Sequence, residues 1–557
     1  MERGLMKSSL LLAAVLMFAG LANAKNRYIV TFKSEQGFSA MSNYLTLENA
    51  NVGFKIQRSL NNLNAVIIKA DSVQALASLK NHPEVASVEA EVFYPSPKPI
   101  FGFKPARVIH TQAVKPQLWN NIVSPQGSST PVLTVGPKTP WGILAVQAGA
   151  AWAESSAGAN ARVLVLDTGI DEGHQDIKAN FEKGKNFYEG DSGVVDPLDY
   201  KDQEGHGTHT SGTIAASYNE ATGFTGVAPK AKLLMGRVCG TLGCSNIAVA
   251  EGIDWGIQEK VDVISMSLGG PFGSSAEQQA VQNAENAGVV VVAASGNGGN
   301  NAVSFPAAFP TVVAVGAIDS TLKKTSFSQY GPELAVVAPG AAVVSTVPRG
   351  SGRESHVSLS IAGIKHAALS SAFSGTKLVP TPIENTLVFA GLGKPEDFAK
   401  INVQGKFALV SRGEIKFGDK IKNAIDGKAA GIVIFNNASG LLQGAATQDG
   451  TEIDFPVVMI EQAEGQALVA ALTKGDVTKA EVSTTPADYA MFDGTSMATP
   501  HVAGVVALIR SANKKLTPAQ IKTLLMSTAT PLGPNTANEY GAGLVQADKA
   551  VHAAVGM

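Results

Sequence analysis

The feature that most constrains this fold is a series of short, very apolar runs separated by segments of helix length. Three of these runs occupy residues 161–166, 261–265 and 289–293. A strand that is apolar all round needs cover on both of its faces, which is the usual situation of parallel strands in α/β proteins. The sequence therefore predicts a doubly wound α/β fold with a mostly parallel sheet, whose sites form at the carboxyl ends of the strands.

The length of the chain implies more than one folded unit. At 557 residues it exceeds what a single hydrophobic core usually serves. The α/β pattern occupies residues 139–350 and 486–557, and residues 376–478 between them have strands and helix spacing of their own. A structureless loop of that length is uncommon in a compact protein. We therefore expect a β-rich domain inserted into the α/β domain.

A different pattern precedes the α/β domain. Runs at 28–32 and 85–92 are rich in β-forming residues, and Asp71 stands where it would cap a helix. Residues 25–95 are thus expected to form a small α+β unit. Residues 96–138 are rich in Pro, Gln and Ser, which predicts an extended linker.

Residues 1–24 have the pattern of a signal peptide. Arg3 and Lys7 precede an apolar run at 10–21, and small residues follow it at 22–24. This run is shorter than the roughly 20 residues that a membrane helix needs. We therefore expect a secreted protein, in the medium or the periplasm. No later window is long and apolar enough for a membrane anchor.

Charge and cysteine content restrict the partners further. The formal net charge is −2 without a long block of like charge, which disfavours a nucleic-acid or anionic-membrane partner. The only two cysteines, Cys239 and Cys244, are expected to form a disulfide in an oxidising compartment. Two free thiols are the alternative. A metal site there would lack further cysteine or histidine ligands nearby.

Asp167 follows the apolar run 161–166 and begins the sequence Asp-Thr-Gly. Its carboxylate is therefore expected at the edge of the sheet. Aspartic peptidases use the same short sequence, but they need two carboxylates that share a proton. The second candidate, Asp191, follows too soon in the chain to belong to a second lobe.

Two further motifs put reactive side chains at expected helix starts. His206 lies in Gly-His-Gly-Thr-His, a sequence that lacks the glutamate of HExxH zinc sites. Ser496 precedes an apolar helical run. The free amides and the positive dipole end of a helix N-terminus stabilise the oxyanion of acyl transfer. By itself, Ser496 could equally be a helix cap.

Together the three motifs resemble those of the subtilase family, which have the order Asp, His, Ser. The resemblance extends from residues 140–143 to 540–544 and is interrupted by the insert. It implies a serine endopeptidase in which Ser496 attacks the substrate carbonyl, His206 takes the proton and Asp167 orients the imidazole. It also implies polypeptide substrates and no cofactor for the chemistry.

The same resemblance implies binding residues. Asn297, which follows the apolar run 289–293, matches an asparagine that donates to the oxyanion. An extended peptide would bind partly by strand addition. The stretches that match the family's substrate pocket carry no charge, so apolar or broad specificity is expected. Their residues are Ser267, Leu268, Gly269, Gly270, Ser295 and Gly296.

Outside these motifs, residues 25–95 resemble the inhibitor-like propeptide of secreted subtilases. This implies a zymogen that is matured by a cut within or near residues 96–138. The insert resembles a protease-associated domain through residues 403–413. Many subtilases hold structural calcium, and Asp176 matches a ligand of some of them. The loop 218–223 does not clearly match the partner loop, so calcium is left open.

Two other classes of function stay open at this point. A non-catalytic, subtilase-like binding protein is suggested by the large insert, and its function would survive the loss of Ser496. A different serine hydrolase, such as an esterase, would turn over esters without cutting peptide bonds. A secreted, monomeric endopeptidase agrees with all the motifs.

Overall fold

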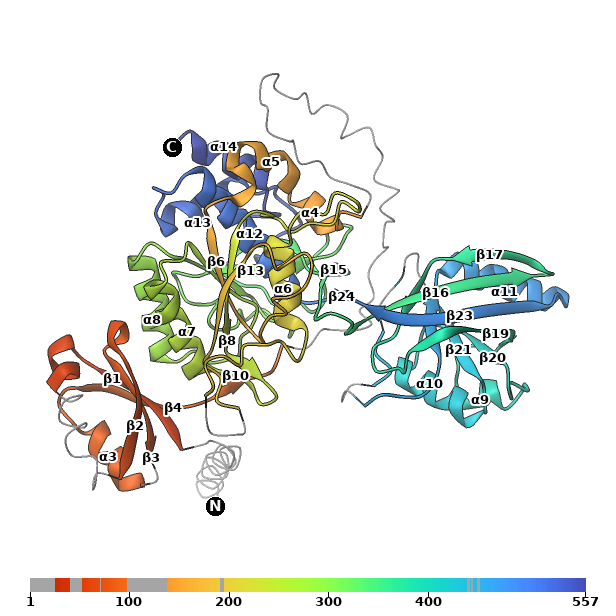
Figure 1. The fold of residues 1–557 in the computed structure, drawn as a ribbon, viewed down its shortest axis with the longest axis horizontal. Helices are drawn as coiled ribbons and strands as arrows, with labels where there is room; N and C mark the ends of the chain where they lie inside the picture. Colours follow the sequence, from red (N-terminus) through yellow and green to blue (C-terminus); the bar gives the residue numbers. More distant parts are fainter. Residues whose placement is uncertain are drawn as a thin grey trace, which may run out of the picture.

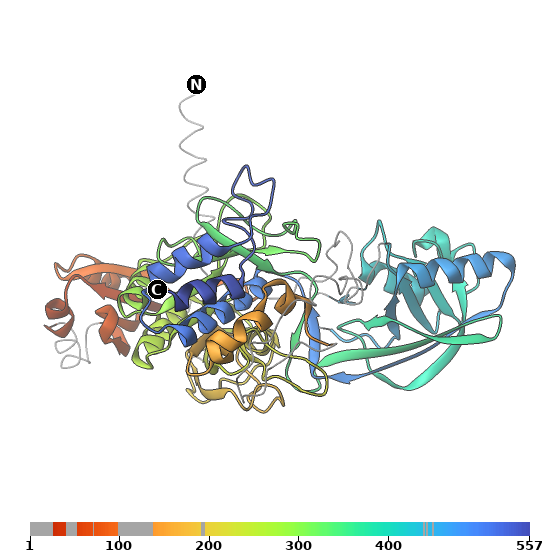
Figure 2. The ribbon, with the colours of Figure 1, turned by 90° about the horizontal axis from the view of Figure 1, so that it is seen from above.

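The computed structural model describes residues 26–40, 53–70, 72–97, 138–190, 195–437, 441, 444–447 and 451–557. The predicted signal peptide and almost all of the predicted linker lie outside these residues. Three bodies follow one another along the molecule (Figure 1, and Figure 2 from above). They are the N-terminal unit in red and orange, called the leader below (residues 26–97), the α/β domain, and the insert in teal and blue. None of the helices within the described ranges is both long and apolar enough to cross a membrane.

A seven-stranded parallel sheet forms the centre of the α/β domain, in the order β14-β13-β12-β11-β6-β8-β7. Every residue of β11 to β14 is buried, so both faces of the sheet are covered. This confirms the doubly wound α/β prediction. The strands are β6 (Arg162–Asp167), β7 (Phe181–Asn186), β8 (Lys232–Arg237), β11 (Val263–Met266), β12 (Val290–Ala294), β13 (Val313–Ile318) and β14 (Leu334–Pro339).

The helices of this domain pack against the sheet and against one another. The long helix α12 contacts five strands, from β6 to β14, and α7 lies beside α8. Apolar side chains of α12, such as Val502, Val505 and Leu508, belong to this core. The helices are α4 (Trp141–Ala145), α5 (Ala148–Ser155), α6 (His206–Ala215), α7 (Asn246–Gln258), α8 (Ser275–Asn286), α12 (Thr495–Ala512), α13 (Pro518–Thr528) and α14 (Ala547–Val555), with a 3-10 turn, η3 (Ser156–Gly158).

The leader is a four-stranded antiparallel sheet with a helix, in the order β2-β3-β1-β4. Val30, Phe32 and Ile68 lie in its own small core. Ser72 caps the helix by accepting from Ala75 N, so the cap predicted at Asp71 was wrong by one position. The elements are β1 (Arg27–Phe32), β2 (Phe54–Leu60), η1 (Asn61–Leu63), β3 (Ala65–Ala70), α3 (Val73–Lys80), β4 (Val85–Ala90) and β5 (Phe93–Tyr94).

The insert contains an eight-stranded sheet in the order β17-β16-β23-β19-β20-β21-β22-β18. Residues 352–372, which the sequence left unassigned, supply three of these strands. Hydrophobic clusters lie on both sides of the sheet. The elements are β16 (Gly352–Ile361), β17 (Ile364–Ala368), β18 (Ser370–Ala372), β19 (Val379–Phe389), α9 (Pro395–Phe398), β20 (Phe407–Ser411), α10 (Phe417–Asp426), β21 (Gly431–Phe435), β22 (Val457–Ile460), α11 (Gln462–Lys474) and β23 (Thr478–Ala487).

A two-stranded antiparallel ribbon joins the insert to the α/β domain. It consists of β15 (Val343–Thr346) and β24 (Tyr489–Phe492), with Thr346 opposite Tyr489. The chain leaves through β15 and returns through β24, so the two connections lie side by side. β24 leads directly into the loop before α12.

Candidate active site

Asp167 and His206 form a buried pair at the carboxyl edge of the central sheet. Asp167 is the last residue of β6 and His206 the first of α6, as the sequence predicted. His206 Nδ1 lies 2.7 Å from Asp167 Oδ1, and both side chains are almost fully buried. Thr168 N donates to the same carboxylate at 2.7 Å, and Thr210 Oγ1 at 3.3 Å. These contacts fix the carboxylate against Nδ1 and leave Nε2 of His206 for a reacting group.

Electrostatics favour a basic imidazole at this position. Burial alone would lower the pKa of His206, but the charge and hydrogen bond of the Asp167 carboxylate outweigh it. The net result is a pKa raised above the ordinary histidine value of 6.5.

Asp202 is a buried carboxylate that the sequence analysis missed. It accepts from Gly205 N at 2.8 Å, from Thr208 N at 2.8 Å and from Thr168 Oγ1 at 2.9 Å. These donors lie on both sides of His206 and next to Asp167. Asp202 therefore ties the loop before α6 to the end of β6. The sequence shows that Asp202 lies four residues before His206. It gives no signal that this aspartate is buried, because an aspartate in a polar loop is usually exposed.

Ser496 lies in the first turn of α12, as predicted. Its Oγ donates to the carbonyl oxygen of Ser267 at 3.0 Å, and Ser267 Oγ donates to the carbonyl oxygen of Ser496 at 2.8 Å. Ser267 follows β11, which lies next to β6 in the sheet, so Ser496 and the Asp167–His206 pair share one edge. The serine hydroxyl donates to Ser267 here, and catalytic hydrogen bonds often tighten only when substrate binds.

Asn297 follows β12 and is held by the residue next to Ser496. Its Oδ1 accepts from Thr495 N and from Thr495 Oγ1, both at 2.9 Å. A Cβ atom built on Gly494 would lie 3.6 Å from Asn297 Nδ2 and 3.6 Å from Ser496 N. The nitrogens of Asn297 and of the Ser496 main chain thus both lie beside the same space next to Gly494.

The residues predicted to bind substrate flank Ser496 on two adjacent strands. Ser267 to Gly270 follow β11, and Ser295 and Gly296 follow β12. The main chain of Gly270 is already paired with Phe305. The leader strand β5 instead pairs with β10 (Gly243–Ser245), a strand that the sequence analysis did not single out.

The predicted disulfide is present between Cys239 and Cys244. It links β9 (Cys239–Gly240) to β10, which pair in antiparallel fashion. The bridge therefore closes the hairpin on which the leader strand lies.

Asp176, the possible calcium ligand of the sequence analysis, is buried beside β24. Its Oδ2 accepts from the hydroxyl of Tyr489 at 2.5 Å. Within the described ranges, no three His, Cys, Asp or Glu side chains gather in a way that could hold a metal ion. Calcium at Asp176 stays a prediction.

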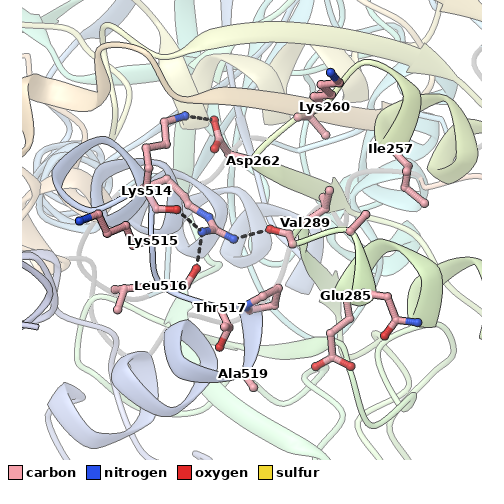
Figure 3. Close-up of a pocket in the computed structure, with 16 residues that line it drawn as sticks. Ile257, Lys260, Asp262, Glu285, Val289, Lys514, Lys515, Leu516, Thr517 and Ala519 are labelled. Carbon is pink, nitrogen blue, oxygen red and sulfur yellow. Dashed lines mark hydrogen bonds and ion pairs between the residues drawn. The ribbon is translucent and has the colours of Figure 1, made fainter.

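A pocket away from Asp167, His206 and Ser496 lies where α8, α12 and the start of α13 meet (Figure 3). Three of its charged residues bind one another or main-chain carbonyls: Lys514 pairs with Asp262 at 2.6 Å, and Arg510 donates to the oxygens of Leu516 and Gly288. These contacts tie α12 to neighbouring loops, and we assign the pocket a structural role.

Comparison with known proteins identifies the fold and the site together. A model of the subtilase family matches residues 158–376 and 462–543, which is more than half of the chain and includes the Asp167, His206 and Ser496 motifs. The chain belongs to the subtilase family. A model of the PA domain matches residues 376–468, which identifies the body inserted into this subtilase.

Individual relatives agree with this assignment. Subtilisin E of Bacillus subtilis (strain 168) is 34% identical over 338 residues, 60% of this chain and 76% of that protein. Subtilisin DY of Bacillus licheniformis is 44% identical over 214 residues, 38% of this chain and 75% of that protein. A psychrophilic subtilisin-like protease from the Antarctic Pseudoalteromonas sp. AS-11 has a similar crystal structure, with a TM-score of 0.56 and 28% identity, over 75% of this chain and 99% of that one. This subtilase is a subtilisin-like serine endopeptidase.

Proposed function

We propose that this subtilase is a secreted protease made as a zymogen, in which Asp167, His206 and Ser496 cut peptide bonds and the leader blocks the site until it is removed. The observation that carries the proposal is the buried Asp167–His206 pair, 2.7 Å apart, at the sheet edge that also holds Ser496. The chemistry needs these side chains and two N–H donors, and no cofactor.

In the proposed mechanism Ser496 Oγ turns from Ser267 toward His206 Nε2. The neutral imidazole takes the hydroxyl proton while Oγ forms a bond to the substrate carbonyl carbon. Asp167 holds Nδ1 and stabilises the imidazolium that results. His206 then gives the proton to the leaving amine, and water hydrolyses the acyl-enzyme by the same steps.

The oxyanion of each tetrahedral intermediate would lie between Ser496 N and Asn297 Nδ2. The orientation of the asparagine amide supports this role, because Thr495 donates twice to its oxygen. The nitrogen end must then face the other way, toward Gly494. Such preorganised donors stabilise charge without reorganising during the reaction.

The proposed inhibitory role of the leader rests on its contacts with α7 and α8. Glu89 accepts from Ser275 N at 3.1 Å and from Ser275 Oγ at 2.5 Å, at the N-terminus of α8. A carboxylate is stabilised there by the free amides and the helix dipole. At α7, Arg27 contacts Glu91 at 2.9 Å and Glu251 at 3.4 Å, and all three side chains are buried.

Secretion, maturation and specificity follow from the sequence patterns. The signal peptide at residues 1–24 would direct export to the medium or the periplasm, and the maturation cut would fall in or near residues 96–138. The absence of charge from the substrate stretches favours apolar or broad specificity for polypeptides. We expect the mature enzyme to act as a monomer, with the insert influencing substrate access or partner contacts.

The proposal is tested by intact mass and casein digestion of the full chain beside Ser496→Ala. Ser351→Ala, which changes an exposed serine between β15 and β16, is the matched control. The wild type and Ser351→Ala are expected to lose the leader and digest casein, and Ser496→Ala is expected to retain the leader and remain inert. Equal behaviour of wild type and Ser496→Ala would reject Ser496 as the nucleophile.

A further inference from the structure

The end of the leader lies on the enzyme as an extended peptide. Tyr94 lies opposite Cys244 and Phe93 opposite Ser245 in the β5–β10 pairing. Two residues further, Ser96 Oγ donates to Glu204 at 2.8 Å, shortly before His206. The segment therefore runs toward the triad from its N-terminal side. Main-chain pairing with side chains in pockets is also how extended substrates bind.

The side chain of Tyr94 is inserted into the α/β domain. It is only 4% exposed and belongs to the hydrophobic core of that domain. Its ring lies directly on Gly270, because a Cβ atom at Gly270 would come within 2.4 Å of Tyr94 Cδ1. Gly270 belongs to the stretch predicted to bind substrate. The pocket that this stretch lines therefore already holds the aromatic ring of Tyr94.

The far end of this pocket is acidic. The hydroxyl of Tyr94 donates to Glu277 Oε2 at 2.5 Å, from the first turn of α8. Glu277 is fully buried, and the same oxygen accepts from Ser274 N at 3.1 Å and from Ser274 Oγ at 2.9 Å. Its second oxygen, Oε1, has no hydrogen-bond partner among the described residues. A buried carboxylate is costly unless donors surround it, so this one favours an occupant with a donor.

We propose that Glu277 determines specificity by selecting tyrosine in this pocket, at the substrate position that Tyr94 holds before the leader is removed. The proposal rests on the proposed protease function and refines its specificity. Because the leader runs toward the triad after Tyr94, the selected residue lies on the amino-terminal side of the bond that is cut. Phenylalanine would fill the same space but leave Glu277 without its donor.

The size of the effect follows from the chemistry of the contact. A site built to hydrogen-bond a hydroxyl rejects the analogue that lacks it, and a charged acceptor strengthens the discrimination. We expect kcat/KM to be about 10- to 100-fold higher for tyrosine than for phenylalanine. Burial raises the pKa of Glu277 to about 7, so the preference should be strongest above neutral pH, where the carboxylate is ionised.

The test uses the mature enzyme that the wild-type chain produces. A peptide library first finds the position on the amino-terminal side at which tyrosine is enriched. Three peptides that differ only there, with Tyr, Phe or Lys, are then assayed at about pH 8.5, above the pKa of Glu277. The ratio of kcat/KM values from one enzyme sample does not depend on the fraction of folded enzyme.

Glu277→Gln and Glu277→Leu are compared with the wild type. Gln at this position retains the capping box with Ser274, whereas Leu removes the acceptor. The Tyr/Phe ratio should fall to a few-fold in Glu277→Gln and to about one in Glu277→Leu. Ser274→Ala weakens the same helix cap but does not remove the acceptor of the Tyr94 hydroxyl. The Tyr/Phe ratio of Ser274→Ala should therefore stay above that of Glu277→Leu.

Either of two results would overturn the specificity proposal while leaving the protease function intact. One is a Tyr/Phe ratio near one in a wild type that digests casein. The other is a Lys peptide cut as well as the Tyr peptide, because the pocket would then respond to positive charge. Failure of the protease function itself appears differently, as absent cleavage of all three peptides or cleavage that persists in Ser496→Ala.

Discussion

Asn297 and Thr495 are joined by two hydrogen bonds to one oxygen, and this pairing sets which end of the asparagine amide faces Ser496. Thr495 N and Thr495 Oγ1 are both donors in this arrangement. They therefore bind the carbonyl end of the amide and direct its N–H₂ group toward the space beside Gly494.

Replacing Asn297 by Ala should lower kcat about 100- to 1,000-fold and change KM little, because the donor acts mainly on the transition state. Asn297→Asp should lose as much activity, since Asp can still accept from Thr495 but offers no N–H to the oxyanion. Steady-state kinetics on one peptide substrate measure both variants. Activity close to wild type in Asn297→Asp would contradict the assigned role.

Replacing Gly494 by Ala should be nearly as damaging as loss of Asn297. The added Cβ would lie 3.6 Å from both oxyanion donors, and the φ of +148° at this position is rarely adopted by other residues. Gly363→Ala is the matched control, because Gly363 also has a positive φ, of +85°, but nothing within 4 Å of the added atom. We expect about a 100-fold or greater loss of kcat in Gly494→Ala and little change in Gly363→Ala. A kcat close to wild type in Gly494→Ala would contradict the assigned role of the space beside Gly494.

The acid limb of the pH–activity profile should reflect His206. A protonated imidazole cannot accept the Ser496 proton, and the pKa of His206 is raised above 6.5 because the Asp167 carboxylate outweighs burial. Activity should therefore be lost as the pH falls through a value above 6.5, and the enzyme should work best at neutral to alkaline pH. The dependence of kcat/KM on pH gives this limb directly. A limb well below 6.5 would argue against the assigned base.

Asp202→Asn should lower the stability of the fold and also the pKa of His206. An amide has one acceptor oxygen, so the donors from Gly205, Thr208 and Thr168 cannot all be satisfied, and we expect a loss of about 2–4 kcal/mol in the free energy of unfolding. The negative charge of Asp202 also raises the pKa of His206, so the acid limb should move to lower pH. Asp196→Asn, which changes an exposed aspartate, is the control and should change neither the free energy of unfolding nor the acid limb. If the melting temperature falls but the acid limb does not move, Asp202 stabilises the fold without influencing the pKa of His206.

Arg27→Ala should release the leader from the enzyme. Arg27 lies among Glu91, Glu189 and Glu251, and breaking a buried ion pair by removing one partner typically costs about 3–5 kcal/mol. In the Ser496→Ala background, the leader of Arg27→Ala should become sensitive to an added protease. Lys33→Ala changes an exposed cation of the leader and should leave it protected. Equal protection in the two variants would show that other contacts hold the leader.

The sequence predicted the fold class and the place of each triad residue because these depend on local signals. Apolar runs marked the parallel strands, Asp167 came directly after one of them, and His206 and Ser496 stood at helix starts. The contacts that the sequence missed join distant parts of the chain. Tyr94 and Glu277 are 183 positions apart, and Arg27 and Glu251 are 224 apart. No local pattern distinguishes such a glutamate from an exposed helix residue, since Glu277 also fits its place as a helix cap.

The ribbon of β15 and β24 has a further consequence for the history of the chain. Thr346 and Tyr489 are paired in this ribbon. The first and last residues of the inserted segment between them are therefore as close together as the two ends of a hairpin loop. A short turn could replace the whole insert and leave the order Asp, His, Ser and the path of the catalytic chain unchanged. The insert therefore has the connections of an interchangeable module, which one genetic event could add or remove without a new fold for the enzyme.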